Sequence, residues 1–246
     1  MIQILMPLAG GAKPFNEKGE TFPKALIEVL SYPLVEYAIK SCHPKEKHLF
    51  IFVVDDESAT QYHLDHTLKV LAPDSKLVIA SGRTGGALCT CLLAVDHINP
   101  DLPLLICNGD QFLEEGVDDA LASFRERELD VGIITFKSAH PRWSFVRRGS
   151  DDLVHETAEK DPISNEATVG VYYFRSASSF VDAATKSLLK HVTYKDQFFV
   201  VPSINQVILN GGRVGAYLIK NQTFHPLGIP EDVEQFSRHY RHSPLS

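Results

Sequence analysis

Four short segments combine charged side chains with small residues that let an anion approach the backbone. They read PLAGGAKPF (7–15), FPKALIEV (22–29), ICNGDQF (106–112) and AEKDPISNEATVGVYYF (158–174). The glycine pair of the first segment can bring backbone N–H groups close to a phosphate. Lys24 follows a proline, which gives its ammonium a fixed approach to a polyphosphate. These residue types indicate chemistry on phosphate groups, although a plain tight turn also explains the glycine pair.

Carboxylates supply the other half of this chemistry. Asp110 lies just past an apolar run, after Asn108 and Gly109, and a carboxylate there can hold Mg²⁺ while phosphates and water complete the coordination. Glu159 can accept hydrogen bonds from hydroxyl or amino groups, and Lys160 beside it can contact a phosphate. Plainer interpretations exist for each, because Asn-Gly-Asp also forms an Asx turn and exposed charges also serve as solvated surface. The four segments together therefore carry more weight than any one of them.

The elements expected to position these residues begin with apolar runs of strand length. They lie at 2–8, 48–54, 76–80 and 102–107, and helical patterns lie between or after them at about 33–42, 58–71, 86–97 and 117–128. Strands that are apolar throughout are typical of a parallel sheet covered by helices on both faces. Ser58 is the expected N-cap of the second helix. The pattern predicts an α/β fold with a Rossmann-like sheet, in which ligands bind beyond the carboxyl ends of the strands.

The second half of the chain has a different pattern. Closely spaced strand-like stretches at 130–138, 143–149, 152–160 and 167–175 predict an antiparallel or mixed extension of the sheet. Helices are expected at about 177–190 and 202–210, a strand at 213–219, and a last helix from Pro230. We interpret residues 1–246 as one domain, with a nucleotide-binding half at about 1–130 and an acceptor-binding half at about 131–246.

Composition excludes several classes of protein. The 246 residues are 44% apolar and carry 24 basic against 31 acidic side chains, a net charge of −7. This balance argues against a basic surface for nucleic acid. The apolar runs are shorter than the roughly 18 residues that a membrane span needs, and the opening segment lacks the basic start of a secretory leader. Four cysteines in a chain of this length do not form a disulfide framework, so we expect a reduced, cytoplasmic protein.

The order of the motifs resembles that of the nucleotidyltransferases that activate sugar phosphates. The resemblance covers nearly the whole chain, through PLAGGAKPF, FPKALIEV, PLVEYAIK, GGALCTCLLA, NGDQF, EKDPISNEATVGVYYF and LGIPEDVEQF. The segments HPRWSF and ISNEATVGVYYF are most similar to the branch that serves capsule and surface polysaccharides. The resemblance implies a Mg²⁺-dependent enzyme with a Rossmann-like mixed sheet. Such an enzyme joins an NTP (CTP, UTP or dTTP) to a sugar phosphate or another small phosphate monoester, releases pyrophosphate, and often forms a homodimer.

The resemblance also implies roles for individual residues. Lys24 and Asp110 match the catalytic lysine and the metal-binding aspartate. The residues implied to bind the nucleotide are Leu8, Ala9, Gly10, Gly11, Lys13, Gly86 and Thr90. Those implied to bind the acceptor are Ser144, Glu159, Lys160 and Gly170.

Two prolines depart from the family pattern. Pro14 stands where relatives have an arginine, with Lys13 one position early, and arginine and lysine are not interchangeable at a bidentate site. Pro226 stands where many relatives have a second metal-binding aspartate, two residues before Gly228. These departures favour one alternative, a non-catalytic descendant that binds a nucleotide or a sugar phosphate. An NAD-dependent enzyme is a weaker alternative, because the dinucleotide fingerprint is absent.

Overall fold

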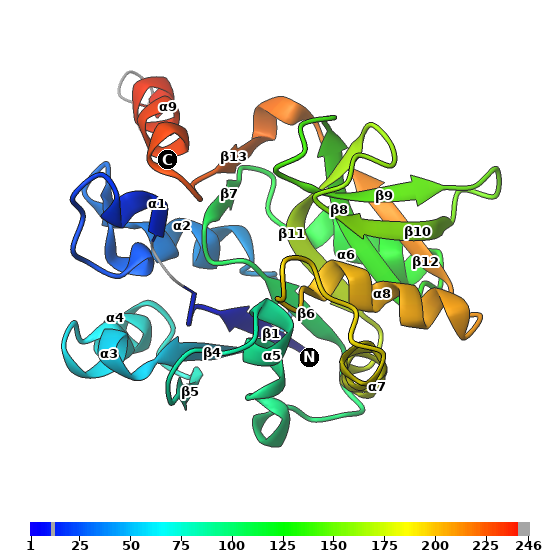
Figure 1. Ribbon diagram of the computed structural model, residues 1–246, viewed down its shortest axis with the longest axis horizontal. Helices are drawn as coiled ribbons and strands as arrows, with labels where there is room; N and C mark the ends of the chain where they lie inside the picture. Colours follow the sequence, from blue (N-terminus) through cyan, green and yellow to red (C-terminus); the bar gives the residue numbers. More distant parts are fainter. Residues whose placement is uncertain (11–12, 241–246) are drawn as a thin grey trace.

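The protein is described by a computed structural model that covers residues 1–10 and 13–240. A nine-stranded sheet crosses the molecule, with helices packed on both faces (Figure 1). Along its main path the strands run in the order β10-β9-β11-β6-β1-β4-β5, and β8 and β12 branch from β11. The predicted α/β class with a Rossmann-like mixed sheet is confirmed.

The parallel part of the sheet is built from the four apolar runs. Its strands are β1 (Ile2–Pro7), β4 (His48–Asp55), β5 (Lys76–Ala80) and β6 (Leu104–Cys107). Ile4 and Met6 of β1 enter the hydrophobic cluster on one face, and Leu5 enters the cluster on the other face. Burial of both faces explains why these strands are apolar throughout and do not alternate with polar residues.

Helices cover the two faces of the sheet. One face packs against α2 (Leu34–Ser41), α4 (Leu64–Leu71) and α6 (Asp118–Glu126), and the other against α5 (Ala87–Leu92), α7 (Ala177–Leu189) and α8 (Val200–Leu209). The shorter helices are α1 (Lys13–Asn16), α3 (Asp56–Thr60) and the 3-10 turns η1 (Lys24–Leu26), η2 (Val95–His97) and η3 (Asn221–Thr223). No helix within the described residues is apolar over enough length to cross a bilayer.

The extension of the sheet is mixed, as predicted. Strand β11 (Glu166–Phe174) runs antiparallel to β6, to β8 (Val131–Lys137) and to β9 (Ser144–Arg148). Strand β10 (Val154–Glu159) forms a hairpin with β9, and β12 (Val214–Leu218) runs parallel to β8. All nine residues of β11 are buried, because strands and helices surround it.

Two small sheets and the last helix complete the fold. Strand β2 (Glu28–Val29) pairs with β3 (Tyr32–Pro33), and β7 (Gln111–Leu113) pairs with β13 (Phe224–Pro226). Helix α9 (Pro230–Tyr240) begins at Pro230 as predicted. Its Phe236 and Tyr240 pack with Phe15 and Tyr37 in a third hydrophobic cluster. The end of the described chain thus packs against its N-terminal part, while the division into two functional halves stays a prediction.

Two predicted helices are interrupted. The stretch 58–71 forms α3 and α4, separated by His63 in the left-handed region (φ 53°), and 86–97 forms α5 followed by η2. The expected N-cap at Ser58 was wrong. Asp55 caps α3, because its carboxylate accepts hydrogen bonds from the backbone N–H of Ser58 (2.8 Å) and from the Ser58 hydroxyl (2.7 Å). Ser58 is therefore a donor in the first turn.

Candidate functional site

An ion pair joins the two residues expected to be catalytic. Lys24 Nζ lies 2.8 Å from Asp110 Oδ2, and each side chain is 25% exposed. Lys24 begins η1 after Pro23 (φ −52°, ψ 140°), and Asp110 lies just beyond the carboxyl end of β6. An ammonium and a carboxylate so arranged keep access to solvent, so both can also contact a bound anion or cation.

The segment after β13 closes around Asp110. The backbone N–H of Leu227 donates to the Asp110 carbonyl (2.8 Å), and a Cβ built on Gly228 would lie 3.2 Å from Asp110 Oδ2. Pro226 is paired with Gln111 between β13 and β7. The position expected for a second metal-binding carboxylate therefore lies beside Asp110, and a proline occupies it.

Two other side chains near this proline, those of Asp232 and His225, are of types that can ligate a metal, but both have partners elsewhere. Asp232 is 8% exposed, and both of its carboxylate oxygens accept hydrogen bonds from Arg142 Nη2 (2.8 and 2.9 Å). His225 Nε2 lies 2.8 Å from Glu114 Oε1, and Tyr240 donates to the same carboxylate. Burial raises the pKa of Asp232, while its bonds to Arg142 oppose this. Asp110 is therefore the carboxylate that remains at the predicted metal position.

The predicted acceptor residues form a second polar pair at the end of the β9–β10 hairpin. Ser144 lies opposite Glu159, and its hydroxyl donates to Glu159 Oε2 (2.5 Å). Burial raises the pKa of Glu159, whereas the Ser144 bond and the Lys160 charge lower it. Lys160 adopts a left-handed backbone (φ 53°). Its Nζ lies 5.7 Å from the ring centre of Tyr194 and 5.4 Å from that of Phe199.

Gly170 in β11 lies beside the segment that carries Asp110. Its carbonyl accepts a hydrogen bond from the backbone N–H of Asn108 (2.9 Å), just before Asp110. Two residues further along β11, burial raises the pKa of Tyr172, and the charges of both Glu159 and Asp110 add to this. The Asp110 and Glu159 carboxylates therefore both act on the charge environment of one buried side chain. We call Lys24, Asp110, Ser144, Glu159, Lys160 and Gly170 the Asp110 site.

The predicted nucleotide loop lies beside this site. The backbone N–H of Leu8 donates to the carbonyl of Val53 (2.7 Å), and the Leu8 side chain fills the space where Gly109 has no Cβ. Ala9 packs against one face of the sheet, and Gly10 is exposed. Gly11 and the side chain of Lys13 lie outside the described residues. Contact between this loop and a nucleotide stays a prediction.

Gly86 and Thr90 have clear local roles. Gly86 has φ +124°, and a Cβ there would lie 2.4 Å from the carbonyl oxygen of Phe198. Thr90 is 3% exposed. Its hydroxyl lies 2.7 Å from the hydroxyl of Thr84 and donates to the carbonyl of Gly86 (3.2 Å). The two residues therefore shape the loop before α5, and their contact with a nucleotide stays a prediction.

No motif in the sequence predicts two further features. Tyr194 and Phe199, whose rings lie near Lys160, come from a loop without a recognisable pattern. A cavity of about 550 Å³ lies between the 138–143 loop, β13 and α9, and Arg142, Trp143, Pro226 and Asp232 are among its lining residues. Lys24, Asp110 and Glu159 do not line it. Trp143 packs there against Phe136 and Phe224, so it is in part a structural anchor.

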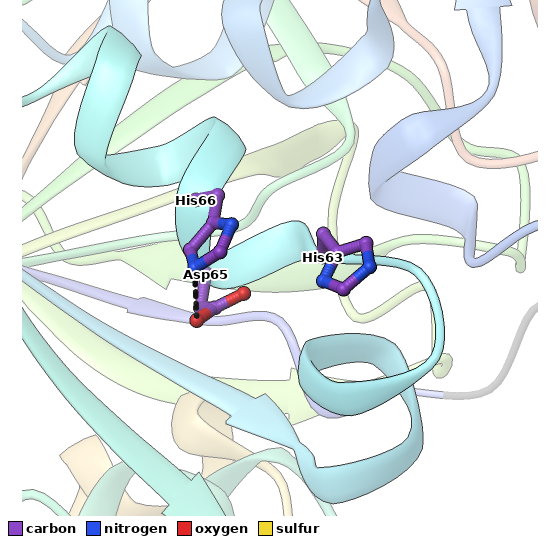
Figure 2. A group of neighbouring side chains, drawn as sticks. All are labelled: His63, Asp65 and His66. Carbon is purple, nitrogen blue, oxygen red and sulfur yellow. Dashed lines mark ion pairs between the residues drawn. The ribbon is translucent and has the colours of Figure 1, made fainter.

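A group of side chains that can ligate a metal also lies at the start of α4 (Figure 2). Within the described residues, His63, Asp65 and His66 have ligand atoms within 4.8 Å of one another. His66 Nε2 lies 3.6 Å from Asp65 Oδ2, and both histidines are exposed. Imidazoles suit zinc-like ions better than Mg²⁺. The group belongs to different elements from those of the Asp110 site.

Comparisons with known proteins agree with this geometry. The family described as Nucleotidyl transferase matches residues 19–240. A nucleoside-diphosphate-sugar pyrophosphorylase from Vibrio cholerae RC9 has a similar structure, with 22% identity, a TM-score of 0.83, and coverage of 96% of this chain and 99% of that chain. An inositol-1-phosphate CTP transferase from T. maritima has 14% identity and a TM-score of 0.72, covering 99% and 98%.

A UDP-glucose pyrophosphorylase from Acinetobacter baumannii has 17% identity and a TM-score of 0.75, covering 100% of this chain and 96% of that chain. At these identities the structures show a shared fold. A comparison with curated protein sequences finds no match. The family match spans most of the chain and includes Lys24, Asp110 and Glu159. The chain therefore belongs to the nucleotidyl transferase family, which confirms the expectation of a nucleotidyltransferase enzyme.

Proposed function

We propose that the protein joins an NTP to a sugar phosphate or another small phosphate monoester and releases pyrophosphate. The observations that carry this proposal are the Lys24–Asp110 ion pair beyond the carboxyl end of β6 and the Ser144–Glu159 pair beside Lys160. One set of charges suits a triphosphate, and the other suits a phosphorylated acceptor with hydroxyl groups. CTP, UTP and dTTP are the proposed nucleotides.

The reaction needs alignment of two anions more than it needs covalent help from the protein. An oxygen of the acceptor phosphate attacks the α-phosphorus of the NTP and forms a new P–O–P bond. The bond to the β-phosphate breaks, and pyrophosphate leaves with the electron pair. The attacking oxygen is already anionic, so no side chain has to act as a base. Lys24 and Lys160 offset the repulsion between the two substrates.

Mg²⁺ is the proposed metal, with Asp110 as its protein ligand. Mg²⁺ is commonly bound through one or two carboxylates, with substrate phosphates and water completing the shell. Asp110 is one carboxylate, 25% exposed and next to a lysine, so it fits binding of Mg²⁺ through a single protein carboxylate. When bound, the ion would neutralise phosphate charge. Pro226 removes the second carboxylate, so the phosphates must supply more of the coordination.

Glu159 and Ser144 would orient the acceptor. Glu159 accepts a hydrogen bond from the Ser144 hydroxyl through Oε2. The remaining lone pairs of the Glu159 carboxylate can accept hydrogen bonds from hydroxyl groups of a sugar. Lys160 would contact the acceptor phosphate. We further propose, from the similarity of HPRWSF and ISNEATVGVYYF, that the product serves surface-polysaccharide synthesis in the cytoplasm. A homodimer is the proposed assembly.

Two measurements in sequence test the proposal. A thermal-shift panel of CTP, UTP, dTTP, GTP and ATP with Mg²⁺ identifies the base, because stabilisation follows ligand affinity. Pyrophosphate release is then measured for each stabilising nucleotide with glucose 1-phosphate, inositol 1-phosphate and glycerol 3-phosphate. Pyrophosphate from one pair supports the proposal. Stabilisation by a nucleotide without pyrophosphate from any pair favours the alternative of a non-catalytic binding protein, for which Pro226 is the supporting observation.

A further inference from the structure

Three side chains at the start of α4 can ligate a metal and lie apart from the Asp110 site. His63 and His66 are exposed, and Asp65 is partly buried. Figure 2 shows them gathered where the chain enters the helix. Their ligand atoms all lie within 4.8 Å of one another, and the two imidazole rings are nearly parallel, with their centres 5.4 Å apart. The proposed reaction uses none of these residues.

The distances within this group suit a small tetrahedral ion. Bonds of about 2.0–2.2 Å from Zn²⁺ to nitrogen and oxygen place neighbouring ligand atoms roughly 3.3–3.6 Å apart. His66 Nε2 and Asp65 Oδ2 are separated by 3.6 Å, at the upper end of this range. The ligand atom of His63 needs only a small movement of an exposed ring. Water or another small molecule would fill the fourth position, as in zinc sites with three protein ligands.

The Asp65 carboxylate lacks the partners that its charge needs. Its Oδ1 is buried, and in the described part of the chain this oxygen has no hydrogen-bond partner. Its Oδ2 lies 3.6 Å from His66 Nε2, which is too far for a hydrogen bond. A buried polar atom without a partner is costly, so it needs an explanation. A divalent cation bound to the carboxylate would supply the missing positive charge.

The first turn of α4 holds these ligands in place. Leu64 and Leu68 are fully buried in the hydrophobic cluster on one face of the sheet, so the turn between them is anchored. His63 precedes the helix with φ 53°, and within the described structure its side chain makes no capping hydrogen bond. Its imidazole is therefore available to a ligand. Ligands that are already held in position lose little freedom on binding, which favours affinity.

Two imidazoles with one carboxylate favour Zn²⁺ over Mg²⁺. Imidazole nitrogen suits zinc, copper and nickel, whereas magnesium takes oxygen ligands. The N-terminal end of the α4 dipole disfavours any cation, and the single charge of Asp65 offsets this. A hard cation would therefore be held weakly, and the imidazoles must supply most of the binding.

The turn that carries His63 also contacts the segment before Lys24. Tyr62 Oη donates to the carbonyl of Thr21 (3.1 Å), and the Tyr62 ring packs edge-on against Phe22 with 5.7 Å between ring centres. Thr21 and Phe22 lie three and two residues before Lys24. An ion bound to His63 would therefore restrain the segment that leads to this lysine.

We propose that His63, Asp65 and His66 form a binding site for one Zn²⁺ ion, and that the bound ion steadies the segment before Lys24. The site is separate from the Mg²⁺ position proposed at Asp110, because it uses other residues and another class of ion. It does not depend on the proposed function.

The test is calorimetric titration of Zn²⁺ into the metal-free protein in excess Mg²⁺, which saturates sites built from oxygen ligands. We expect the wild type to bind one Zn²⁺ at this site. His63→Asn and His66→Gln should each weaken that binding by at least about tenfold, since loss of even an outer partner of a metal ligand costs this much. Asparagine tolerates the left-handed backbone of His63, and the His66 side chain is 77% exposed. Both variants should therefore keep the fold.

His155→Gln is the matched control. His155 Nε2 lies 2.8 Å from Asp151 Oδ1, and the described residues add no third ligand to this exposed pair. The control should leave Zn²⁺ binding unchanged, whereas Asp65→Asn should weaken it. Bound Zn²⁺ should also slow backbone hydrogen exchange within residues 19–24 of the wild type, and the His66→Gln variant should show no such slowing.

Several outcomes would overturn the inference. Absence of Zn²⁺ binding by the wild type in excess Mg²⁺, or equal affinity of the wild type and both histidine variants, would remove the site. An equal loss of affinity in His155→Gln would assign the ion to scattered surface histidines. Unchanged hydrogen exchange within residues 19–24 on Zn²⁺ binding would remove the effect on the segment before Lys24. Pyrophosphate release, measured separately with Mg²⁺ alone, reports on the proposed function whatever the result for Zn²⁺.

Discussion

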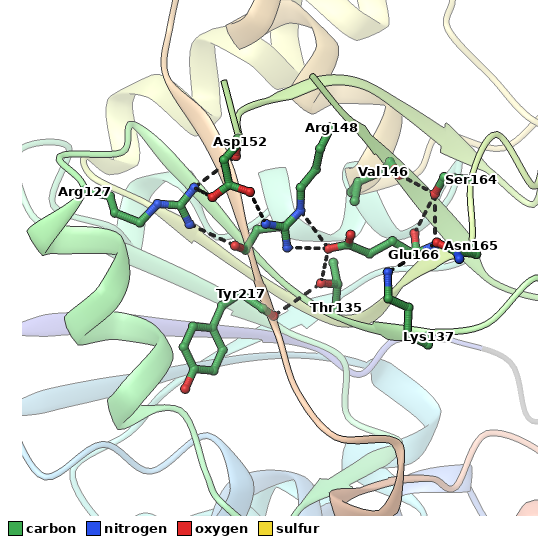
Figure 3. A network of polar contacts seen from close by, with 11 residues as sticks. Arg127, Thr135, Lys137, Val146, Arg148, Asp152, Ser164, Asn165, Glu166 and Tyr217 are labelled. Atoms are coloured by element: carbon green, nitrogen blue, oxygen red, sulfur yellow. Dashed lines mark hydrogen bonds and ion pairs between the residues drawn. The ribbon is translucent and has the colours of Figure 1, made fainter. Parts of the chain in front are cut away.

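Two regions of the molecule border the same long strand, β11, and use their charged side chains differently. At the start of β11, Glu166 is 7% exposed, and its Oε1 accepts from Thr135 (2.6 Å) and twice from Arg148 (3.1 and 2.6 Å) (Figure 3). Arg148 also donates to Asp152 (2.7 Å), which Arg127 contacts in turn (3.1 Å). We call these five residues the Glu166 network.

The Asp110 site, which meets this strand at Gly170, is less complete. Asp110 has one ion pair and Glu159 has one hydroxyl bond, and next to the site, directly after Asp110, Gln111 Nε2 has no partner within the described residues. None of the buried side-chain atoms found without a partner belongs to the Glu166 network. A saturated network stabilises the fold, and an unsaturated site keeps capacity for a ligand. Substitutions should therefore reduce stability in one region and activity in the other.

The largest expected effect is that of Asp110→Asn. Loss of the carboxylate removes the proposed Mg²⁺ ligand, so pyrophosphate release should fall by about 10³-fold or more. Tm should change little, because the ion pair with Lys24 is partly exposed. Asp152→Asn is the matched control in the Glu166 network and should leave turnover unchanged. Near-normal turnover of Asp110→Asn would remove the proposed metal role.

Arg148→Met tests the other region. It leaves the Glu166 carboxylate buried with one hydroxyl donor, and breaking a buried pair in this way costs about 3 kcal/mol of unfolding free energy. Tm should fall by about 6–12 °C, while KM for the acceptor stays the same. Arg147→Met is the control, since its pair with Glu156 is exposed on both sides and should matter little. Equal losses from the two variants would contradict the distinction.

These two regions also differ in how far the sequence predicted them. The strands β1, β4, β5 and β6 were predicted within two residues because their burial on both faces gives continuous apolar runs. Lys24 and Asp110 were found by motif, and the structure brings them into contact. The Glu166 network had no signal, because Thr135, Arg148 and Glu166 are far apart in sequence and no short pattern joins them.

Local details were missed for related reasons. The break at His63 depends on one left-handed residue that helical periodicity does not reveal. The cap at Asp55 and the proposed cap at Ser58 are chemically similar, so only the structure separates them. The unpaired amide of Gln111 is a property of its surroundings and leaves no pattern in the sequence.

Lys24→Met should have the next largest effect. Loss of the ammonium removes charge compensation at the NTP, so kcat/KM should fall by about a hundredfold. The free energy of unfolding should change by less than about 1 kcal/mol, since the pair is solvent-accessible. Lys40→Met, which removes a surface pair with Glu36 in α2, is the control for loss of a lysine. A drop in stability equal to that of Arg148→Met would place Lys24 with the structural residues.

Glu159→Gln should have the smallest effect on stability, and the size of that effect depends on pH. Burial raises the pKa of Glu159 above its ordinary value of 4.5, while Ser144 and Lys160 oppose this. Between that value and the folded pKa, the folded protein binds a proton that the unfolded chain releases, so the Glu159 contribution to stability is lost as pH rises. Glutamine stays neutral and has no such loss.

Relative to the wild type, Glu159→Gln should therefore have the higher Tm at about pH 7, and the difference should vanish near about pH 4. At the same time, KM for the acceptor should rise by about tenfold, because an amide oxygen accepts more weakly than a carboxylate. Glu156→Gln, on the exposed face of β10, is the control and should show neither change. A lower Tm for Glu159→Gln than for the wild type would mean that the neighbours of Glu159 hold it in the ionised form, as Arg148 and Thr135 hold Glu166. The difference between the two regions would then not extend to Glu159.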